Sequence, residues 1–219
     1  NDLKKMLSGS LNIGITYTFA PILTETVIAF TKAHPAVKLN IFYKTMEELM
    51  SMLEKRELDF VLSFKPSTVH PAIESHVLFD NNLSVIVNRY HPLAEKEKIT
   101  LQDILPHGIA MPAKGLQSRN EFDKLYPSAY NQMKVRMELN EVNVLLDIVR
   151  GSSLITILSE AVIHQTNGLV AIPFDVPDNI MVGCVHTERG AYRKKAAEEF
   201  IRMLQESEAV RERAIQWLE

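Results

Sequence analysis

The spacing of apolar residues divides the first third of the chain into alternating strands and helices. Residues 11–15 alternate between apolar and polar positions, which is typical of a β-strand. After Pro21, apolar residues recur on one helix face at Leu23, Val27 and Phe30. We therefore predict a strand and then a helix that ends before Pro35, because the residue that precedes a proline avoids the helical region.

The same alternation continues to residue 64. Residues 37–43 are expected to form a second strand, and Thr45 with Glu48 has the spacing of a helix-capping box. The apolar run at residues 58–64 predicts a third strand that is covered on both faces, as in a parallel sheet. This β-α-β-α-β order predicts a doubly wound α/β lobe.

A second set of elements follows a polar connection at residues 80–82. Its strands are expected at residues 83–88, 108–111, 134–139, 154–158 and 169–174. Its helices are expected to begin at Thr100 and Ser118, and to cover residues 142–149 and 159–165. A second polar connection at residues 175–178 precedes a strand at 180–186 and helices at 192–205 and 209–218. We expect the 180–186 strand to return to the sheet of the first lobe.

Composition and charge exclude several classes of protein. The chain is 46% hydrophobic and 23% charged with a formal net charge of −3, so bulk charge does not favour nucleic-acid binding by this piece. The single cysteine, Cys184, excludes an internal disulfide and a cysteine-based zinc site. No apolar stretch approaches the roughly 18 residues that span a bilayer. We expect a cytoplasmic protein without membrane contact, and a fragment, because the sequence begins at Asn1.

The sequence also lacks the motifs of the common enzyme classes. It contains no glycine-rich phosphate loop, no G-x-S-x-G elbow and no H-E-x-x-H helix. The seven histidines are scattered and do not have the spacing of metal ligands. We therefore expect no enzymatic activity, no metal and no cofactor other than a small-molecule effector.

Several strings along the chain resemble one family, the effector-binding domain of LysR-type transcriptional regulators. LSGSLNIG at residues 7–14 resembles its G-x-L-x-I-G start, and FTKAHPAVKL at 30–39 resembles F-x-x-x-x-P-x-V-x-L. LEKRELDF at 53–60 is similar to L-x-x-G-x-L-D, and HPLA at 91–94 matches that family's string outright. VRGSSLITIL at 149–158 resembles V-x-x-G-x-G-I-x-x-L-P, with Ser153 in place of the second glycine and Ser159 in place of the proline.

The resemblance implies two doubly wound α/β lobes joined by two crossover strands, like the type 2 periplasmic-binding-protein fold. One lobe would comprise residues 1–81 and 175–219, and the other residues 82–174. A winged helix-turn-helix domain and a linker helix would precede this fragment, with residues 2–7 at the end of the linker. The departures from the family pattern concern the shape of the loop before Leu154.

Ligands of doubly wound sheets bind beyond the carboxyl ends of the strands, where helix N-termini offer unpaired N–H groups. The candidate effector-binding residues at such places are Thr16, Tyr17, Thr18, Ser63, Phe64, Lys65, Gln117, Ser118, Asn140 and Asn143. The alternatives are that a threonine, Ser118 or Asn140 only caps a helix, and that Lys65 points into solvent. Helix N-termini and hydroxyls favour an anionic ligand.

The sequence thus favours an allosteric sensor of transcription. It would bind a small, anionic metabolite between its lobes and act on DNA through the missing N-terminal domain. The resemblance implies a dimer of this domain, with the first helix near residues 143–150 of the partner, and a tetramer of the full-length protein. The alternatives are a solute-binding protein of a transport system and an enzyme that reuses the fold.

Overall fold

The computed structural model describes residues 6–68, 70–164 and 166–214. The expected linker end at residues 2–7 and the last helix at 209–218 therefore lie partly outside the described residues. The chain divides into two compact units, and each has its own sheet and core. Unit 1 comprises residues 1–79 and 182–219, and unit 2 comprises residues 80–181.

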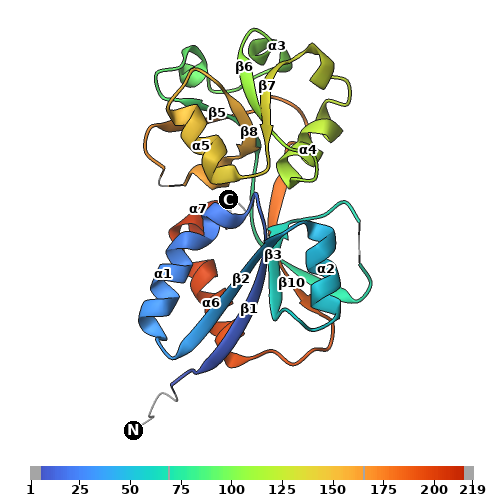
Figure 1. Ribbon diagram of the computed structural model, residues 1–219, viewed down its shortest axis with the longest axis vertical. Helices are drawn as coiled ribbons and strands as arrows, with labels where there is room; N and C mark the ends of the chain where they lie inside the picture. The colour runs from blue at the N-terminus through green and yellow to red at the C-terminus, as the bar shows by residue number, and fades with distance from the viewer. Residues whose placement is uncertain (1–5, 69, 165, 215–219) are drawn as a thin grey trace. The chain divides into compact units, whose positions relative to one another are not determined.

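Unit 1 is built on a five-stranded sheet (Figure 1). Its strands are β1 (Gly9–Thr16), β2 (Val37–Lys44), β3 (Phe60–Phe64), β4 (Ile73–Asn81) and β10 (Met181–Glu188), in the order β2-β1-β3-β10-β4. β2 and β3 run parallel to β1, as expected for a doubly wound lobe. β10 pairs antiparallel with β3, which confirms that this late strand returns to the first sheet. The sequence pattern did not predict β4.

Helices cover both faces of this sheet. They are η1 (Ala20–Leu23), α1 (Thr24–Ala33), α2 (Met46–Glu54), α6 (Lys195–Glu206) and α7 (Glu208–Ala214). α1 and α6 lie on one face and α2 on the other (Figure 1). The ring of Phe200 lies 5.2 Å from that of Phe30 and 5.8 Å from that of Phe60, so α6 packs against both α1 and β3. Thr45 caps α2 as predicted, because its hydroxyl accepts the Glu48 N–H at 3.3 Å.

Unit 2 repeats this arrangement with other segments. Its strands are β5 (Leu83–Asn88), β6 (Gly108–Pro112), β7 (Lys134–Leu139), β8 (Thr156–Ser159) and β9 (Leu169–Pro173). β5 runs antiparallel to both β8 and β9, and β6 runs parallel to β7. A bridge between Ile109 and Ile155 places β6 beside the start of β8, which gives the order β7-β6-β8-β5-β9. Both units therefore have one antiparallel strand at the same place in the order.

The helices of unit 2 differ from the sequence-based expectation in two N-terminal caps and in the length of one helix. They are η2 (Pro92–Glu95), α3 (Leu101–Ile104), α4 (Gln117–Leu125), η3 (Tyr130–Gln132), α5 (Val142–Arg150) and η4 (Glu160–Ile163). Ser118 lies inside α4, whose N-cap is Leu116, so it does not cap the helix. Asn140 does not cap α5, because the Glu141 carboxylate accepts the Val144 N–H at 2.7 Å. The helix expected at 159–165 is only the short 3-10 turn η4.

The boundaries between the two units differ by a few residues from those that the sequence predicted. The expected boundaries followed residues 81 and 174, whereas the structure divides the chain after Phe79 and Met181. Residues 175–181 stay with unit 2 because their polar groups are bonded there. The Asn179 side chain accepts the Leu83 N–H at 2.8 Å and donates to the carbonyls of Leu83 and Phe174 at 2.9 and 3.0 Å.

Candidate functional site

The first candidate residues lie where β1 ends in unit 1. The Phe19 N–H donates to the Thr16 carbonyl at 3.0 Å, and this turn leads from the strand into η1. Thr16 and Thr18 are buried and Tyr17 is half-buried. The Thr18 hydroxyl has no hydrogen-bond partner among the residues that the structure describes. A buried hydroxyl without a partner costs about 1–3 kcal/mol, so Thr18 is suited to meet a ligand.

The Ser63 hydroxyl, a predicted ligand contact, already has two partners within unit 1. It donates to the Phe64 carbonyl at 2.8 Å and lies 2.7 Å from His186 Nε2. His186 Nδ1 in turn lies 2.6 Å from the Ser75 hydroxyl. These contacts fit an imidazole that carries its proton on Nε2 and accepts the Ser75 O–H at Nδ1. Ser63 therefore belongs to a hydrogen-bonded chain across β3, β10 and β4.

Burial determines the charge of this histidine. His186 is 1% exposed, and burial lowers its pKa to about 4 from the ordinary 6.5. The imidazole is therefore neutral at physiological pH, and its contacts with two hydroxyls are compatible with that state. We call Ser63, Ser75 and His186 the histidine chain.

Phe64 and Lys65, the next two predicted contacts, differ in burial: Phe64 is buried and Lys65 is exposed. The Phe64 ring is buried and lies 5.4 Å from the ring of Phe19 and 6.3 Å from that of Phe79, so it packs in the core of unit 1. The Lys65 side chain is exposed, in agreement with the solvent alternative. The Lys65 N–H donates to the Val182 carbonyl at 2.7 Å.

In unit 2 the first turn of α4 holds two candidate residues. Gln117 is half-buried, and Ser118 is fully buried with no partner for its hydroxyl in the described part of the chain. No side chain caps the N-terminus of α4. Asn140 and Asn143 lie beyond the edge strand β7 and are exposed, so unit 2 does not enclose them.

Sequence reasoning missed other buried polar groups of unit 2. Asn81 and Ser159 are buried without partners among the described residues, at the ends of β4 and β8. The only sequence signal was the serine at 159, where the family string has proline. Arg119 is 2% exposed and bonds Asp123 at 3.0 Å and Glu138 at 2.9 Å, so this network fixes α4 beside β7.

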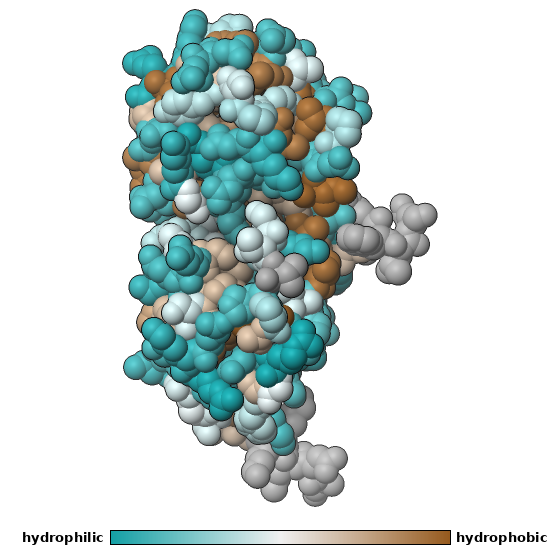
Figure 2. All heavy atoms as spheres, turned by 90° about the vertical axis from the view of Figure 1, so that its right-hand side faces the viewer, coloured by the Kyte–Doolittle hydropathy of each residue, from teal (hydrophilic) through white to brown (hydrophobic). Residues whose placement is uncertain are grey.

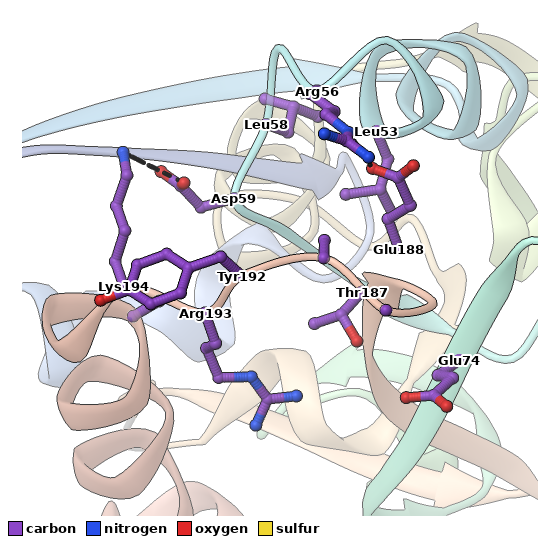
Figure 3. A pocket seen from close by; sticks show the side chains of 13 residues that line it. Leu53, Arg56, Leu58, Asp59, Glu74, Thr187, Glu188, Tyr192, Arg193 and Lys194 are labelled. Atoms are coloured by element: carbon purple, nitrogen blue, oxygen red, sulfur yellow. Dashed lines mark hydrogen bonds and ion pairs between the residues drawn. The ribbon is translucent and has the colours of Figure 1, made fainter.

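A cavity of about 220 Å³ lies elsewhere in unit 1. It opens where β3 begins and β10 ends, away from the carboxyl end of β1. Two ion pairs lie in its lining (Figure 3): Lys194 lies 3.1 Å from Asp59, and Arg56 lies 3.2 Å from Glu188. The surface over α2 is mostly hydrophilic (Figure 2). Because these two ion pairs join neighbouring elements across the cavity, we assign it a structural role.

A family model described as the LysR substrate binding domain matches residues 4–209. The chain belongs to this family. Curated relatives agree, although the chain spans only part of their length. It is 25% identical over 212 residues to the RuBisCO operon transcriptional regulator of Allochromatium vinosum, covering 92% of this chain and 70% of the relative. It is 23% identical to the transcriptional activator CmpR of Synechocystis sp., covering 78% of this chain and 57% of CmpR.

Solved structures confirm the fold of this LysR-type domain. The CcmR regulatory domain of Synechocystis PCC6803 in complex with 2-PG superposes with a TM-score of 0.74 at 20% identity, covering 91% of this chain and 97% of that one. The effector-binding domain of QuiR in complex with shikimate gives 0.68 at 21% identity, covering 94% and 98%. The expected two-lobed α/β fold is therefore confirmed. None of the described helices is long and apolar enough to cross a membrane.

Proposed function

We propose that this chain is the effector-sensing domain of a LysR-type transcriptional regulator. The observation that supports this most strongly is the family match over residues 4–209. The curated relatives are named as regulators of transcription, which disfavours the solute-binding alternative and an enzymatic role. The related domains of CcmR and QuiR hold 2-PG and shikimate, so a small organic acid is the expected class of effector. The proposal requires no cofactor, and it places the protein in the cytoplasm with the DNA.

The anionic group of the effector would bind at the carboxyl end of β1. Thr16 and Thr18 are buried there, and the Thr18 hydroxyl lacks a partner within the described residues. A hydroxyl that donates to an anion forms a charge-assisted bond, which is stronger than a bond between neutral groups. Thr18 is therefore the residue on which we base the test.

The test uses Thr18→Val, which removes the hydroxyl and keeps the side-chain shape. A thermal-shift screen of organic acids, including 2-phosphoglycolate and shikimate, identifies the acid that stabilises the wild-type domain most. Calorimetry with that acid should show a loss of affinity of roughly 10- to 100-fold in the variant. Thr156→Val removes another buried, unpartnered hydroxyl, in unit 2, and should leave the affinity unchanged. Equal affinities of wild type and Thr18→Val would contradict the assignment.

We also propose that the domain self-associates and that full-length chains form tetramers. Two large apolar residues on helices are exposed: Ile28 on α1 by 62% and Val144 on α5 by 45%. Such residues fit an interface in which α1 of one copy meets α5 of another. Light scattering at high micromolar concentration should report a dimer, and Ile28→Lys should shift it toward monomer. DNA contact would be made by an N-terminal helix-turn-helix domain outside this chain.

A further inference from the structure

Several polar side chains of unit 2 are buried without a hydrogen-bond partner among the described residues: Ser84 and Thr156 on the face that α5 covers, and also Asn81, Ser118 and Ser159. Ser118 and Ser159 are 0% exposed and Asn81 is 7% exposed. Neither serine hydroxyl, and neither polar atom of the Asn81 amide, has a partner in the described ranges 6–68, 70–164 and 166–214. Each such group is unfavourable by about 1–3 kcal/mol unless something bonds it. We call Asn81, Ser118 and Ser159 the neutral cluster.

The strand register brings Asn81 and Ser159 to the same end of the sheet. Leu83 of β5 pairs with Ser159 of β8, and the Glu160 N–H donates to the Asn82 carbonyl at 2.9 Å. Asn81 lies two residues before Leu83. Positions that are diagonal across an antiparallel pair are near enough for side chains to meet a common group.

Ser118 lies on the helix that covers the same face of the sheet as Ser159. Leu158 packs in the apolar cluster with Val142 and Leu146 of α5, so the next residue, Ser159, faces the opposite side. α4 covers that side, and Figure 1 shows α4 and α5 on opposite faces. Ser118 lies in the first turn of α4. The cluster therefore gathers at the carboxyl end of β8, beneath the N-terminus of α4.

The side chains of the neutral cluster carry no charge. Hydroxyls and a carboxamide both donate and accept hydrogen bonds. The adjacent cation, Arg119, is already bound by Asp123 and Glu138. A hydroxyl of an effector also donates and accepts, so it can bond these groups in both directions.

We propose that Asn81 and Ser159, together with Ser118, select an effector that bears an uncharged hydroxyl group. The domain would then prefer hydroxylated organic acids to the deoxy acids of the same skeleton. This inference rests on the proposed function as a sensor of organic acids. A deoxy acid leaves the cluster unpaired, so its affinity should be lower by at least about 10-fold.

Calorimetry on the purified domain tests this preference with matched probes. The pairs are malate with succinate, glycolate with acetate, and quinate with cyclohexanecarboxylate. In the wild type, the hydroxylated member of a binding pair should bind at least about 10-fold more tightly. Ser159→Ala and Asn81→Leu should each reduce that ratio toward 1 and retain the affinity for the deoxy acid. Ser159→Ala changes so little volume that it serves as the test even if Asn81→Leu does not fold.

Thr156→Val is the matched control, because Thr156 is also buried on β8 without a partner but lies on the face of the sheet that α5 covers. It should retain the full selectivity. Equal affinity of both members of a pair in the wild type, or an unchanged ratio in Ser159→Ala, overturns the inference and leaves the sensor function standing. A wild-type domain that binds none of these acids, 2-phosphoglycolate or shikimate overturns both.

Discussion

Acidification from pH 7 to pH 4 should destabilise the domain through His186. The folded state holds this imidazole neutral with a pKa of about 4, whereas the unfolded chain has the ordinary value of 6.5. As the pH falls, the unfolded state therefore binds the proton first. The stabilisation is complete above about pH 6.5 and is lost progressively between 6.5 and 4.

The size of the effect follows from the two pKa values. One pKa unit corresponds to about 1.4 kcal/mol, so protonation of the unfolded chain removes about 2 kcal/mol by pH 5 and about 3 kcal/mol by pH 4. Below pH 4 both states bind the proton and the loss levels off. These losses are large beside the 5–15 kcal/mol that stabilise a typical domain.

Urea unfolding at pH 7, 6, 5 and 4 measures this dependence. His186→Gln keeps a neutral hydrogen-bonding group in the histidine chain but does not titrate. It should be less stable than the wild type at pH 7, and the difference should narrow by about 2 kcal/mol at pH 5. His76→Gln, at an exposed histidine of β4, should follow the wild-type profile. Parallel profiles of the wild type and His186→Gln would refute the reasoning.

Other variants test the packing and the buried charges. A methyl group at Gly183 would lie 2.5 Å from the Phe79 ring, so Gly183→Ala should lower the free energy of unfolding by about 1–3 kcal/mol in a urea titration. Arg119→Met should cost about 1–3 kcal/mol, since it removes buried hydrogen bonds. Arg202→Met, which breaks two exposed ion pairs, should lower the free energy of unfolding less than Arg119→Met, and equal losses would count against this distinction. Burial raises the pKa of the Cys184 thiol to about 11, so a thiol reagent at pH 8 should react with it only after unfolding.

Strands with a clear pattern could be predicted because their sequence determines the face that is buried. The alternation of residues 11–15 lies within β1, and the run at 58–64 contains β3. β4 was missed because its central residues, from Ser75 to Val77, are exposed and give no alternating signal. The antiparallel places of β5 and β10 depend on partners far away in the sequence, which no local pattern specifies.

The candidate site could be predicted only where chain order determines position. Thr16 and Thr18 lie at the end of β1 because they directly follow its apolar run. The contacts of Ser63 could not be predicted because all five residues of β3 are buried, so the pattern does not tell which face a side chain occupies. Asn81 and Ser159 come together through pairing of β5 with β8, which is a long-range contact.

The antiparallel strand in each sheet has a consequence for how the chain folds as it is synthesised. All strands that form the sheet of unit 2 lie within residues 83–173, so this sheet can form before the chain is finished. The sheet of unit 1 cannot, because β10 must enter between β3 and β4 after residues 82–180 have been made. Until then β3 has an unpaired edge, and such edges promote association with other chains. A chain that stops at residue 180 should therefore aggregate through β3, although the whole of its second sheet is present.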